Sequence, residues 1–492
     1  MSTTTVSAAV PFPDGAPGPH RDPHQSPYRS PYQSYVYAYP HKTAYRRLPD
    51  RPALRGLWER ERTDALSLYL HIPFCEVRCG FCNLFTRIGA PDGLTGAYLD
   101  ALERQAGSVR EALGEGARFA TAAFGGGTPT FLTAAELERL CDIAEERMGA
   151  DLRAVPLSVE ASPSTATADR LAVLAGRGTT RLSIGVQSFV DAEARAAVRP
   201  QRRSDVEAAL GRVREAGIPV LNIDLIYGIE GQTTATWQRS LDAALAWEPE
   251  ELYLYPLYVR PLTGLGRAVA DPDTSGGSDA SDGSDASGGP AVPDLRWDAQ
   301  RLALYRHGRD HLLAHGYEQV SMRMFRRTGT TATAGTDGGT ADHACQTDGM
   351  VGLGCGARSY TSALHYSFDY AVGMRRIRSI IDDYVSRPAE SFAHAEVGRW
   401  MDNDEARRRH LLQSLLQAEG METAHYTDRF GAPPAEHFPA ELAGFAERGW
   451  LDEGGAPGRL RLSAEGLAHS DAVGPALFSP SVRAAMAAYD PR

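Results

Sequence analysis

Three cysteines, Cys75, Cys79 and Cys82, stand close together with the spacing C-x3-C-x2-C. Thiolates are the soft ligands that iron–sulfur clusters require. A [4Fe–4S] cluster on three cysteines leaves one iron without a protein ligand, and that iron can bind a small molecule. The triplet therefore predicts a cluster that takes part in catalysis rather than one that only carries electrons.

Zinc is the main alternative for the same residues. A structural zinc ion needs a fourth protein ligand, which His71 could supply, and a catalytic zinc ion holds a water in that position. A disulfide framework suits a short secreted chain, whereas this chain has 492 residues and no signal-peptide pattern. The spacing of the cysteines, on a loop expected directly after a strand, favours the iron–sulfur cluster.

A repeated strand–helix rhythm is expected to position this loop. Short runs of β-branched or aromatic residues alternate with segments whose apolar residues recur every three or four positions. The predicted strands are 65–71, 119–124, 156–160, 181–186, 220–226 and 251–257, and the predicted helices are 94–113, 133–148, 166–177, 190–197, 204–216 and 234–247. This alternation indicates parallel βαβ units and an α/β fold. Six units favour an incomplete barrel, with an open doubly wound sheet as the alternative.

Residues suited to ligand binding follow at the ends of these strands. Glycine-rich segment 125–130 ends the second strand, and glycines let backbone N–H and C=O groups approach a ligand closely. Glu160 ends the third strand, Gln187 ends the fourth, and Asp224 lies among apolar neighbours in the fifth. Taken alone, the glycines would suit a tight turn, and Glu160 and Arg199 would suit an exposed surface. The carboxyl ends of barrel strands form the active face, which favours ligand binding.

The segment from Tyr69 to Cys82, which includes YLHIPFC, resembles the signature of the radical S-adenosylmethionine (SAM) superfamily. It resembles in particular the branch of oxygen-independent coproporphyrinogen III oxidase, the heme chaperone HemW and the class C radical SAM methyltransferases. The similarity runs from about Tyr69 to Pro261 and is traceable through the C-terminal part. The resemblance implies a partial (β/α)6 radical SAM barrel with a mainly helical C-terminal domain. It also implies a [4Fe–4S] cluster on the three cysteines, with SAM chelating the open iron.

The resemblance further implies the chemistry and the residues that bind SAM. An electron from the cluster cleaves SAM into methionine and a 5′-deoxyadenosyl radical, which abstracts hydrogen from the substrate. The cofactors are then the cluster and one or two SAM molecules. The glycine segment would hold the SAM amino group, Glu160 the ribose or a second SAM, and Arg199 the carboxylate. The full implied set is Tyr69, Phe81 against the adenine, Gly126, Gly127, Thr128, Glu160, Gln187, Arg199, Asp224 and Pro256.

Three functions compete within this branch. The first is a coproporphyrinogen-oxidase-like oxidoreductase acting on an unknown small organic molecule, with an electron donor such as flavodoxin or ferredoxin. The second is a class C methyltransferase, and the third is a non-catalytic heme chaperone. Coproporphyrinogen oxidases carry a further cysteine soon after the third ligand, whereas this chain reads Cys82-Asn83-Leu84-Phe85-Thr86. The chaperones typically read C-D-F there, and C-N also occurs among the methyltransferases. We therefore expect the first function without conversion of coproporphyrinogen III.

Composition divides the chain into five parts. These are a flexible tail 1–45, the core barrel 46–270, a low-complexity insertion 271–293, a barrel-completing and substrate-side region 294–385, and a helical, winged-helix-like domain 386–492. Residues 1–34 are expected to be disordered, and the aromatic stretch 35–40 is expected to dock on the folded body. A second low-complexity stretch covers 328–340. Further helices are expected at 295–315, 405–419, 438–449 and 462–472, and the chain is expected to be mainly helical after Cys355.

The other cysteines and the overall charge add weaker expectations. Cys141 lies on an apolar helical stripe and should belong to the core. Cys355 lies in GLGCGARSY, which resembles the family's glycine-rich segment beside the substrate, and a packed thiol is favoured there over a reactive one; Cys345 receives no role. The net charge of −11 argues against a nucleic-acid partner, and no apolar run is long enough to cross a membrane. A cytoplasmic location is expected.

Overall fold

The computed structural model describes residues 30–270, 294–330, 345, 349–452, 454 and 457–490. The low-complexity insertion 271–293 lies outside these residues, as does most of the second stretch, from residue 331 onward. Residues 1–29 of the expected tail also lie outside them.

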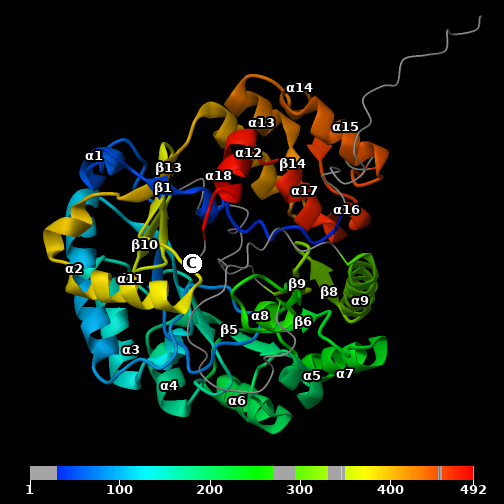
Figure 1. Cartoon of the computed structure of the whole chain (residues 1–492), viewed down its shortest axis with the longest axis horizontal. Coiled ribbons are helices and arrows are strands. Elements are labelled where there is room, and N and C mark those ends of the chain that lie inside the picture. Colours follow the sequence, from blue (N-terminus) through cyan, green and yellow to red (C-terminus); the bar gives the residue numbers. More distant parts are fainter. Residues whose placement is uncertain are drawn as a thin grey trace, which may run out of the picture.

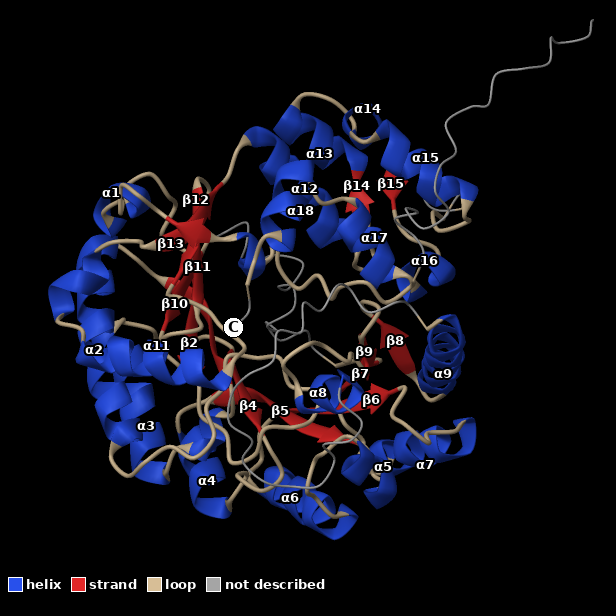
Figure 2. Ribbon diagram, viewed as in Figure 1, coloured by secondary structure: helices blue, strands red, loops and turns tan. Residues whose placement is uncertain are grey.

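Six parallel strands in sequence order form the centre of the sheet, as predicted. Their side chains are apolar and mostly buried on both faces, which is typical of a parallel sheet covered by helices. Figures 1 and 2 show the strands following an arc, with the helices outside it. The strands are β2 (Leu66–Ile72), β3 (Phe119–Gly126), β4 (Leu157–Ala161), β5 (Thr179–Gln187), β6 (Val220–Tyr227) and β7 (Glu251–Pro256).

The connecting helices agree with the predicted ones to within a few residues, apart from the second. That predicted helix, 133–148, begins at a capping box between Thr133 and Glu136 and changes to a π-helical turn at Ile143–Arg147. The helices bury their apolar stripe against the sheet. They are α2 (Leu94–Leu113), α3 (Ala134–Asp142), α4 (Ala168–Gly176), α5 (Asp191–Ala196), α6 (Arg203–Glu215) and α7 (Thr234–Leu245).

Further strands extend the sheet at both edges. On one side β10 (Met350–Leu353) pairs parallel with β2, and β11 (Arg358–Tyr360), β12 (Leu364–Ser367), β13 (Val397–Trp400) and β1 (Arg46–Arg47) follow antiparallel. On the other side β9 (Met324–Arg327) and β8 (Tyr317–Gln319) follow β7 antiparallel. The prediction that the chain is mainly helical after Cys355 is therefore wrong up to residue 400. Strands this short carry too few alternating residues to be recognised from sequence.

The remaining helices of the barrel part lie around these strands. The predicted helix 295–315 is confirmed as α9 (Leu295–Ala314). The side chain of Asp294 caps its N-terminus by accepting hydrogen bonds from the backbone N–H groups of Arg296 and Trp297. The others are α1 (Leu54–Trp58), α8 (Gly264–Ala270), α11 (Met374–Ser386) and the 3₁₀ turns Lys42–Ala44, Pro129–Phe131 and Ala389–Ala393. No helix in the described ranges is long and apolar enough to cross a membrane.

Residues 30–45 are packed on the protein, so the predicted flexible tail is too long at this end. Tyr32, Tyr39 and Tyr45 are buried, and the docking of the aromatic stretch 35–40 is confirmed. The Tyr39 hydroxyl donates to Glu405, and the segment continues into edge strand β1. Sequence composition suggested disorder because Pro and Ser dominate residues 1–34, but the tyrosines provide buried area from Tyr32 onward.

A C-terminal helical part has a hydrophobic core of its own, to which Tyr39 also belongs. Figure 1 places it between the two ends of the strand arc. Arg323 next to β9 forms a buried ion pair with Asp471, which fixes the two parts together. The elements are α12 (Asn403–Leu415), α13 (Thr423–Phe430), α14 (Pro434–His437), α15 (Pro439–Glu447), α16 (Ala464–Ala468), α17 (Ser470–Ala476), α18 (Pro480–Ala487) and the paired strands β14 (Met421–Glu422) and β15 (Arg459–Leu460).

Candidate functional site

The three cysteines lie on the loop that follows β2, and each thiol is free and half-buried. The loop is closed by backbone hydrogen bonds from Cys75 N to Arg87 O, at 3.1 Å, and from Arg87 N to Pro73 O, at 2.6 Å. Gly80 N donates to Ala197 O, which joins the middle of the loop to the segment after α5. The C-x3-C-x2-C segment is thus held at the carboxyl edge of the sheet, where the sequence placed it.

The glycine segment supports the cysteine loop with its own backbone. Gly127 N donates to Ile72 O at 2.8 Å, and Thr128 N donates to Phe74 O at 2.9 Å. A Cβ atom on Gly127 would lie 2.6 Å from Phe74 O, so only glycine allows this approach. Gly126 N donates to Glu160 Oε2 at 3.0 Å. These three N–H groups are therefore used within the protein, so the binding of a ligand by this segment stays a prediction.

Two predicted residues contact the cysteine sulfurs directly. The Thr128 hydroxyl lies 3.4 Å from Cys75 Sγ, and Arg199 Nη1 donates to Cys79 Sγ at 3.2 Å. Burial raises the pKa of Cys75 to about 12 and also raises that of Cys82. Such thiols need positive charge beside them to lose their protons, and iron ions supply that charge on binding. The donor set therefore fits an iron–sulfur cluster.

His71, the fourth ligand that a structural zinc ion would need here, is directed to other partners. Within the described ranges no three His, Cys, Asp or Glu side chains are arranged as they stand to hold a single metal ion. A cluster binds each thiolate to a different iron, so its ligands need not converge. His71 is buried instead, with Nδ1 3.2 Å from the Tyr69 hydroxyl and Nε2 3.3 Å from Phe85 O.

Arg199, which by itself suited an exposed surface, is half-buried and fixed by three contacts. Besides Cys79, its Nη2 donates to Gly185 O at 2.5 Å and its Nε donates to Gln201 Oε1 at 2.6 Å. A guanidinium has five N–H donors, so two remain for a ligand on the same planar group. The Arg199 guanidinium is therefore fixed beside Cys79 and still has two N–H donors available.

Gln187 has an unusual, left-handed backbone conformation. Its φ is +70°, which a residue other than glycine rarely adopts, and the pairing of β5 with β6 shifts register between Gly185 and Gln187. Its side chain is half-buried rather than buried, and its amide has no hydrogen-bond partner among the described residues. Such strain is concentrated at binding sites, where it re-aims a side chain.

The two predicted carboxylates are both half-buried and oriented by hydrogen bonds. Glu160 accepts from Gly126 N, as described above. Asp224 accepts from Ser183 Oγ at 3.2 Å and from Asn222 Nδ2 at 2.7 Å. Asp224 lies within β6 rather than at its end, and this network satisfies the need for partners that its apolar neighbours implied.

The last three predicted residues lie around these groups. Burial raises the pKa of Tyr69 well above its ordinary value, and Glu160 raises it further, so the two side chains are close. Phe81 packs against the apolar cluster of Ala197, Ile226, Ile229 and Leu257. Pro256 is buried at the end of β7, next to Leu257 of that cluster.

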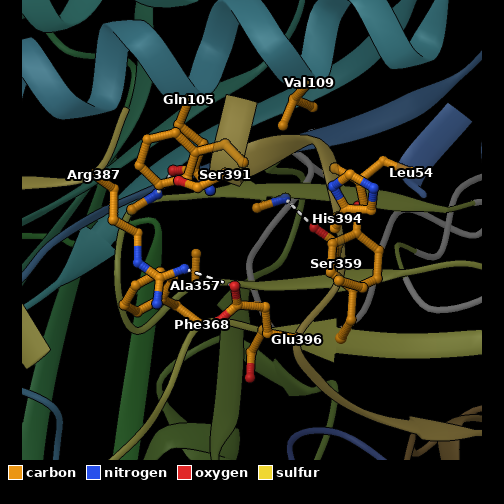
Figure 3. A pocket seen from close by; sticks show the side chains of 16 residues that line it. Leu54, Gln105, Val109, Ala357, Ser359, Phe368, Arg387, Ser391, His394 and Glu396 are labelled. Carbon is orange, nitrogen blue, oxygen red and sulfur yellow. Dashed lines mark hydrogen bonds and ion pairs between the residues drawn. The ribbon is translucent and has the colours of Figure 1, made fainter. Parts of the chain in front are cut away.

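Two of the remaining cysteines, Cys141 and Cys355, and the pocket in Figure 3 contribute none of these groups. Cys141 is buried in the core, as predicted, and Cys355 is buried with its thiol 3.9 Å from the Tyr98 hydroxyl. The pocket in Figure 3 lies between α2 and the β10–β13 edge, and none of the predicted site residues lines it. In its lining Arg387 and Glu396 already pair with each other at 3.0 Å, and we assign no ligand to it.

Comparison with known proteins agrees with this geometry. Residues 69–244 match the profile of the radical SAM superfamily. The chain carries a radical SAM domain. This domain contains the cysteine loop and every predicted SAM residue except Pro256. Membership of this domain in the radical SAM superfamily implies a [4Fe–4S] cluster and SAM as cofactors.

Sequence similarity to known proteins extends beyond this domain and covers most of the chain. The heme chaperone HemW of Bacillus subtilis is 25% identical over 385 residues, which are 78% of this chain and 92% of that protein. An oxygen-independent coproporphyrinogen III oxidase of Pseudomonas aeruginosa is 27% identical over 418 residues, 83% of each chain. The structure of coproporphyrinogen III oxidase (HemN) from Escherichia coli matches with a TM-score of 0.73 at 23% identity, covering 90% of this chain and 96% of that one. That match establishes the fold.

Sequence reasoning missed residues from the N-terminal segment near the radical SAM domain's cysteine loop. Lys42 Nζ lies 3.7 Å above the ring of Tyr370, whose hydroxyl donates to Asn83 O at 2.9 Å, one residue after Cys82. A sequence signal was present, because Lys42 is the only lysine in the chain.

Proposed function

We propose that the protein is a radical SAM oxidoreductase that removes hydrogen from a small organic substrate. The observation that carries the proposal is the convergence of separate elements on the cysteine loop. Thr128, after β3, reaches Cys75, and Arg199, after α5, reaches Cys79. Residues so far apart in sequence meet at the carboxyl edge of the strands, where the active site of a barrel belongs.

In this proposal Cys75, Cys79 and Cys82 hold the cluster, and the surrounding residues bind and orient SAM. When bound, the cluster supplies the electron that cleaves SAM and so produces the radical that takes hydrogen from the substrate. Carbonyl oxygens of segment 125–127 accept from the SAM ammonium, since its N–H groups are used within the protein. The two remaining donors of Arg199 pair with the SAM carboxylate.

The other predicted residues complete the SAM site in this proposal. Glu160 and Asp224 accept from the ribose hydroxyls, each already oriented by a donor from the protein. Gln187, turned by its positive φ, donates to a polar group of SAM. Phe81 and Pro256 border the adenine on the apolar cluster beside β7, and Tyr69 lies next to Glu160.

SAM cleavage tests this function. Protein reconstituted anaerobically with iron and sulfide, then reduced with dithionite, should convert SAM to 5′-deoxyadenosine without added substrate, measured by liquid chromatography and mass spectrometry. Cys82→Ala should abolish the product, whereas Cys141→Ala, which removes a buried thiol far from the loop, should retain it. Absence of 5′-deoxyadenosine from cluster-loaded wild-type protein would overturn the proposal.

A heme chaperone is the second candidate, because the Bacillus subtilis HemW matches over 92% of its length. Its prediction is stoichiometric heme binding, seen as a Soret band on titration of the cluster-loaded protein, together with no turnover of SAM. Substrate-independent SAM cleavage without heme binding favours the oxidoreductase. Transfer of a labelled methyl group from SAM would instead indicate the methyltransferase chemistry.

A further inference from the structure

The middle of the cysteine loop is in contact with an exposed apolar side chain from another element. Gly80 N donates to Ala197 O at 3.1 Å, and a Cβ atom on Gly80 would lie 2.8 Å from the Cβ atom of Val198. Val198 is still 50% exposed, and the next residue, Arg199, donates to Cys79 Sγ at 3.2 Å. The exposed valine is thus one residue away from a direct contact with a predicted cluster ligand.

The backbone of Val198 is strained. Its φ is +51°, and it is the one β-branched residue with a positive φ in the part of the chain that the structure describes. A branched side chain crowds the backbone in this conformation, and the half-exposed valine gains little burial in return. Because strain of this kind is concentrated at functional sites, Val198 marks a candidate binding surface.

Helix α8 contacts the same glycine. Leu265 N donates to Gly80 O at 2.8 Å, and Leu262, just before the helix, also has a positive φ, of +67°. The cysteine loop itself adds a second exposed apolar side chain, because Val77, three residues before Gly80, is 42% exposed. The cysteine loop, the segment after α5 and α8 therefore meet at Gly80, with exposed valines from two of the three.

Arginines surround these valines. Arg195, Arg202 and Arg267 are exposed, and none of them forms an ion pair with a carboxylate among the described residues. Arg267 is also close enough to Arg78 of the cysteine loop for their charges to repel each other. We call this surface the Gly80 face; it consists of Val77, Val198, Arg195, Arg202 and Arg267.

The carboxylates next to the Gly80 face are directed to other groups. Asp191 accepts from Arg203 N at 2.8 Å, and buried Glu193 accepts from Ser188 Oγ at 2.7 Å. Glu76, beside Val77, accepts from Ser164 Oγ. The face is therefore positive, whereas the whole chain has a net charge of −11. An acidic partner is repelled by the rest of such a surface and attracted to this part of it.

We propose that the Gly80 face is the docking surface for a protein electron donor whose own docking face is acidic. This inference rests on the proposed function, in which each cleavage of SAM needs an electron, and it names the partner that delivers it. One electron passes from the docked donor, which is oxidised, to the cluster, which is reduced, and no atom is transferred.

The composition of the face suits this kind of partner. Complexes between redox proteins bury small interfaces, and protein interfaces in general combine an apolar centre with a polar rim in which arginine is enriched. Two exposed valines among three unpaired arginines match that pattern. A donor seated on Val198 would also lie next to Arg199 and Cys79, so the electron would enter where the fold brings a cluster ligand nearest to this face.

Two reductants separate docking from catalysis. Dithionite is a small molecule that needs no docking surface, and a reduced bacterial flavodoxin with an acidic surface serves as the probe donor. Arg195→Glu combined with Arg202→Glu should lower SAM cleavage driven by subsaturating flavodoxin about tenfold or more. Cleavage driven by dithionite should be unchanged, because neither arginine is assigned to the SAM site.

A matched double reversal controls for the change in net charge. Arg60→Glu combined with Arg62→Glu alters two exposed arginines just after α1, and Figures 1 and 2 show α1 and α5 at opposite sides of the molecule. This control should retain the rates with both reductants. Equal flavodoxin-driven rates in wild-type protein and the Arg195→Glu, Arg202→Glu variant would overturn the docking surface.

Affinity provides a second measurement that needs no turnover. Calorimetric titration of the cluster-loaded protein with flavodoxin, without SAM, should show a dissociation constant that the Arg195→Glu, Arg202→Glu variant raises about tenfold or more. For wild-type protein the affinity should fall as the salt concentration rises from about 0.05 M to about 0.5 M, because exposed charges are screened. The salt series uses the unaltered sequence, so it tests the face even where a variant folds poorly. An affinity that does not depend on salt would contradict the proposal.

The remaining outcomes assign each failure to one proposal. Wild-type protein that cleaves SAM with dithionite but neither binds flavodoxin nor is reduced by it refutes only the docking surface. Protein that binds flavodoxin through these arginines but cleaves SAM with neither reductant refutes only the radical chemistry. If sedimentation shows that wild-type protein self-associates and the Arg195→Glu, Arg202→Glu variant does not, the face joins two copies of this chain and the assignment to a donor is wrong.

Discussion

Each cysteine of the triplet is approached by a different part of the fold. Thr128 reaches Cys75, Arg199 reaches Cys79, and the Thr86 hydroxyl lies 3.9 Å from Cys82 Sγ. Arg199 donates to Cys79, and the Thr128 and Thr86 hydroxyls can each donate to a deprotonated sulfur, which stabilises the thiolate. The thiols are therefore surrounded by groups suited to the charged form, although burial alone opposes it.

Loss of one cysteine should prevent cluster assembly. Reconstituted wild-type protein should contain about four irons per chain and a broad thiolate-to-iron absorption band. Cys79→Ala should lose both, because two thiolates cannot hold the cluster stably. Iron analysis and absorption spectroscopy measure this, with Cys141→Ala as the control. A full cluster in Cys79→Ala, or zinc as the native metal, would contradict the assignment of the ligands.

Removal of the Arg199 side chain should weaken SAM binding. A charge-assisted pair with a carboxylate contributes about 1.5–3 kcal/mol, so Arg199→Ala should raise the dissociation constant about tenfold or more. Equilibrium dialysis with labelled SAM measures the change, and Arg202→Ala, a nearby arginine not assigned to the site, serves as control. An unchanged dissociation constant would mean that this guanidinium supports only Cys79 and the end of β5.

At the scale of elements, the buried residue Asp471 of helix α17 contacts both the N-terminal segment 30–47 and the barrel. Asp471 on α17 accepts from the Tyr258 hydroxyl and pairs with Arg323, and its backbone oxygen accepts from Gln33 N and Ser34 N. One residue thus joins the N-terminal segment, the strand region and the C-terminal part.

Asp471→Asn should destabilise the protein strongly. It leaves the buried Arg323 without a counter-charge, and breaking such a pair costs about 3–5 kcal/mol. Urea denaturation followed by circular dichroism measures the free energy of unfolding. Asp310→Asn, which disrupts the exposed contact with Arg309, should cost at most about 1 kcal/mol. Equal stability of the two variants would show that the junction contributes little.

The low-complexity insertion between α8 and α9 should be dispensable. Ser, Asp and Gly repeats provide no apolar area for a core, and the cost of closing a loop changes slowly with its length. Replacement of residues 273–292 by a short Gly-Ser linker should leave SAM cleavage and soluble yield nearly unchanged. A large loss of either quantity would reveal a role for the insertion.

At the scale of the whole molecule, the fold matches that of an oxidase while the loop after Cys82 departs from the oxidases. The Escherichia coli enzyme matches with a TM-score of 0.73, yet this chain has Asn83 and Leu84 where a further cysteine is expected. Both side chains are exposed, and Leu84 is 47% exposed despite being apolar. The loop after Cys82 therefore lacks the further cysteine that the resemblance leads us to expect in an oxidase.

Coproporphyrinogen III should not be converted. Anaerobic incubation with reductant, SAM and coproporphyrinogen III, analysed by mass spectrometry, should yield 5′-deoxyadenosine but no doubly decarboxylated product. The Escherichia coli oxidase assayed in parallel provides the positive control. Appearance of the product would overturn the inference from the missing cysteine and leave the radical chemistry intact.

The sequence by itself determined the six central strands, most of the helices between them and the place of the cysteine triplet that we propose as the cluster ligands. These features depend on residues near one another in the chain, as in the C-x3-C-x2-C spacing and the apolar periodicity of segment 94–113. The position of Glu160 near the end of its strand was likewise predicted from the local sequence pattern.

Only the tertiary structure decided how distant residues meet. Composition predicted a flexible segment through residue 45, but buried tyrosines and the junction at Asp471 order it from residue 30. Strands β11 to β13 are too short to show a pattern, and their pairing is non-local. The N–H groups of Gly127 and Thr128 donate to Ile72 O and Phe74 O, and that of Gly126 donates to Glu160. Lys42 meets Arg358 from the far end of the chain. Hydrogen bonds and charges act through space, so local sequence does not specify which distant groups they join.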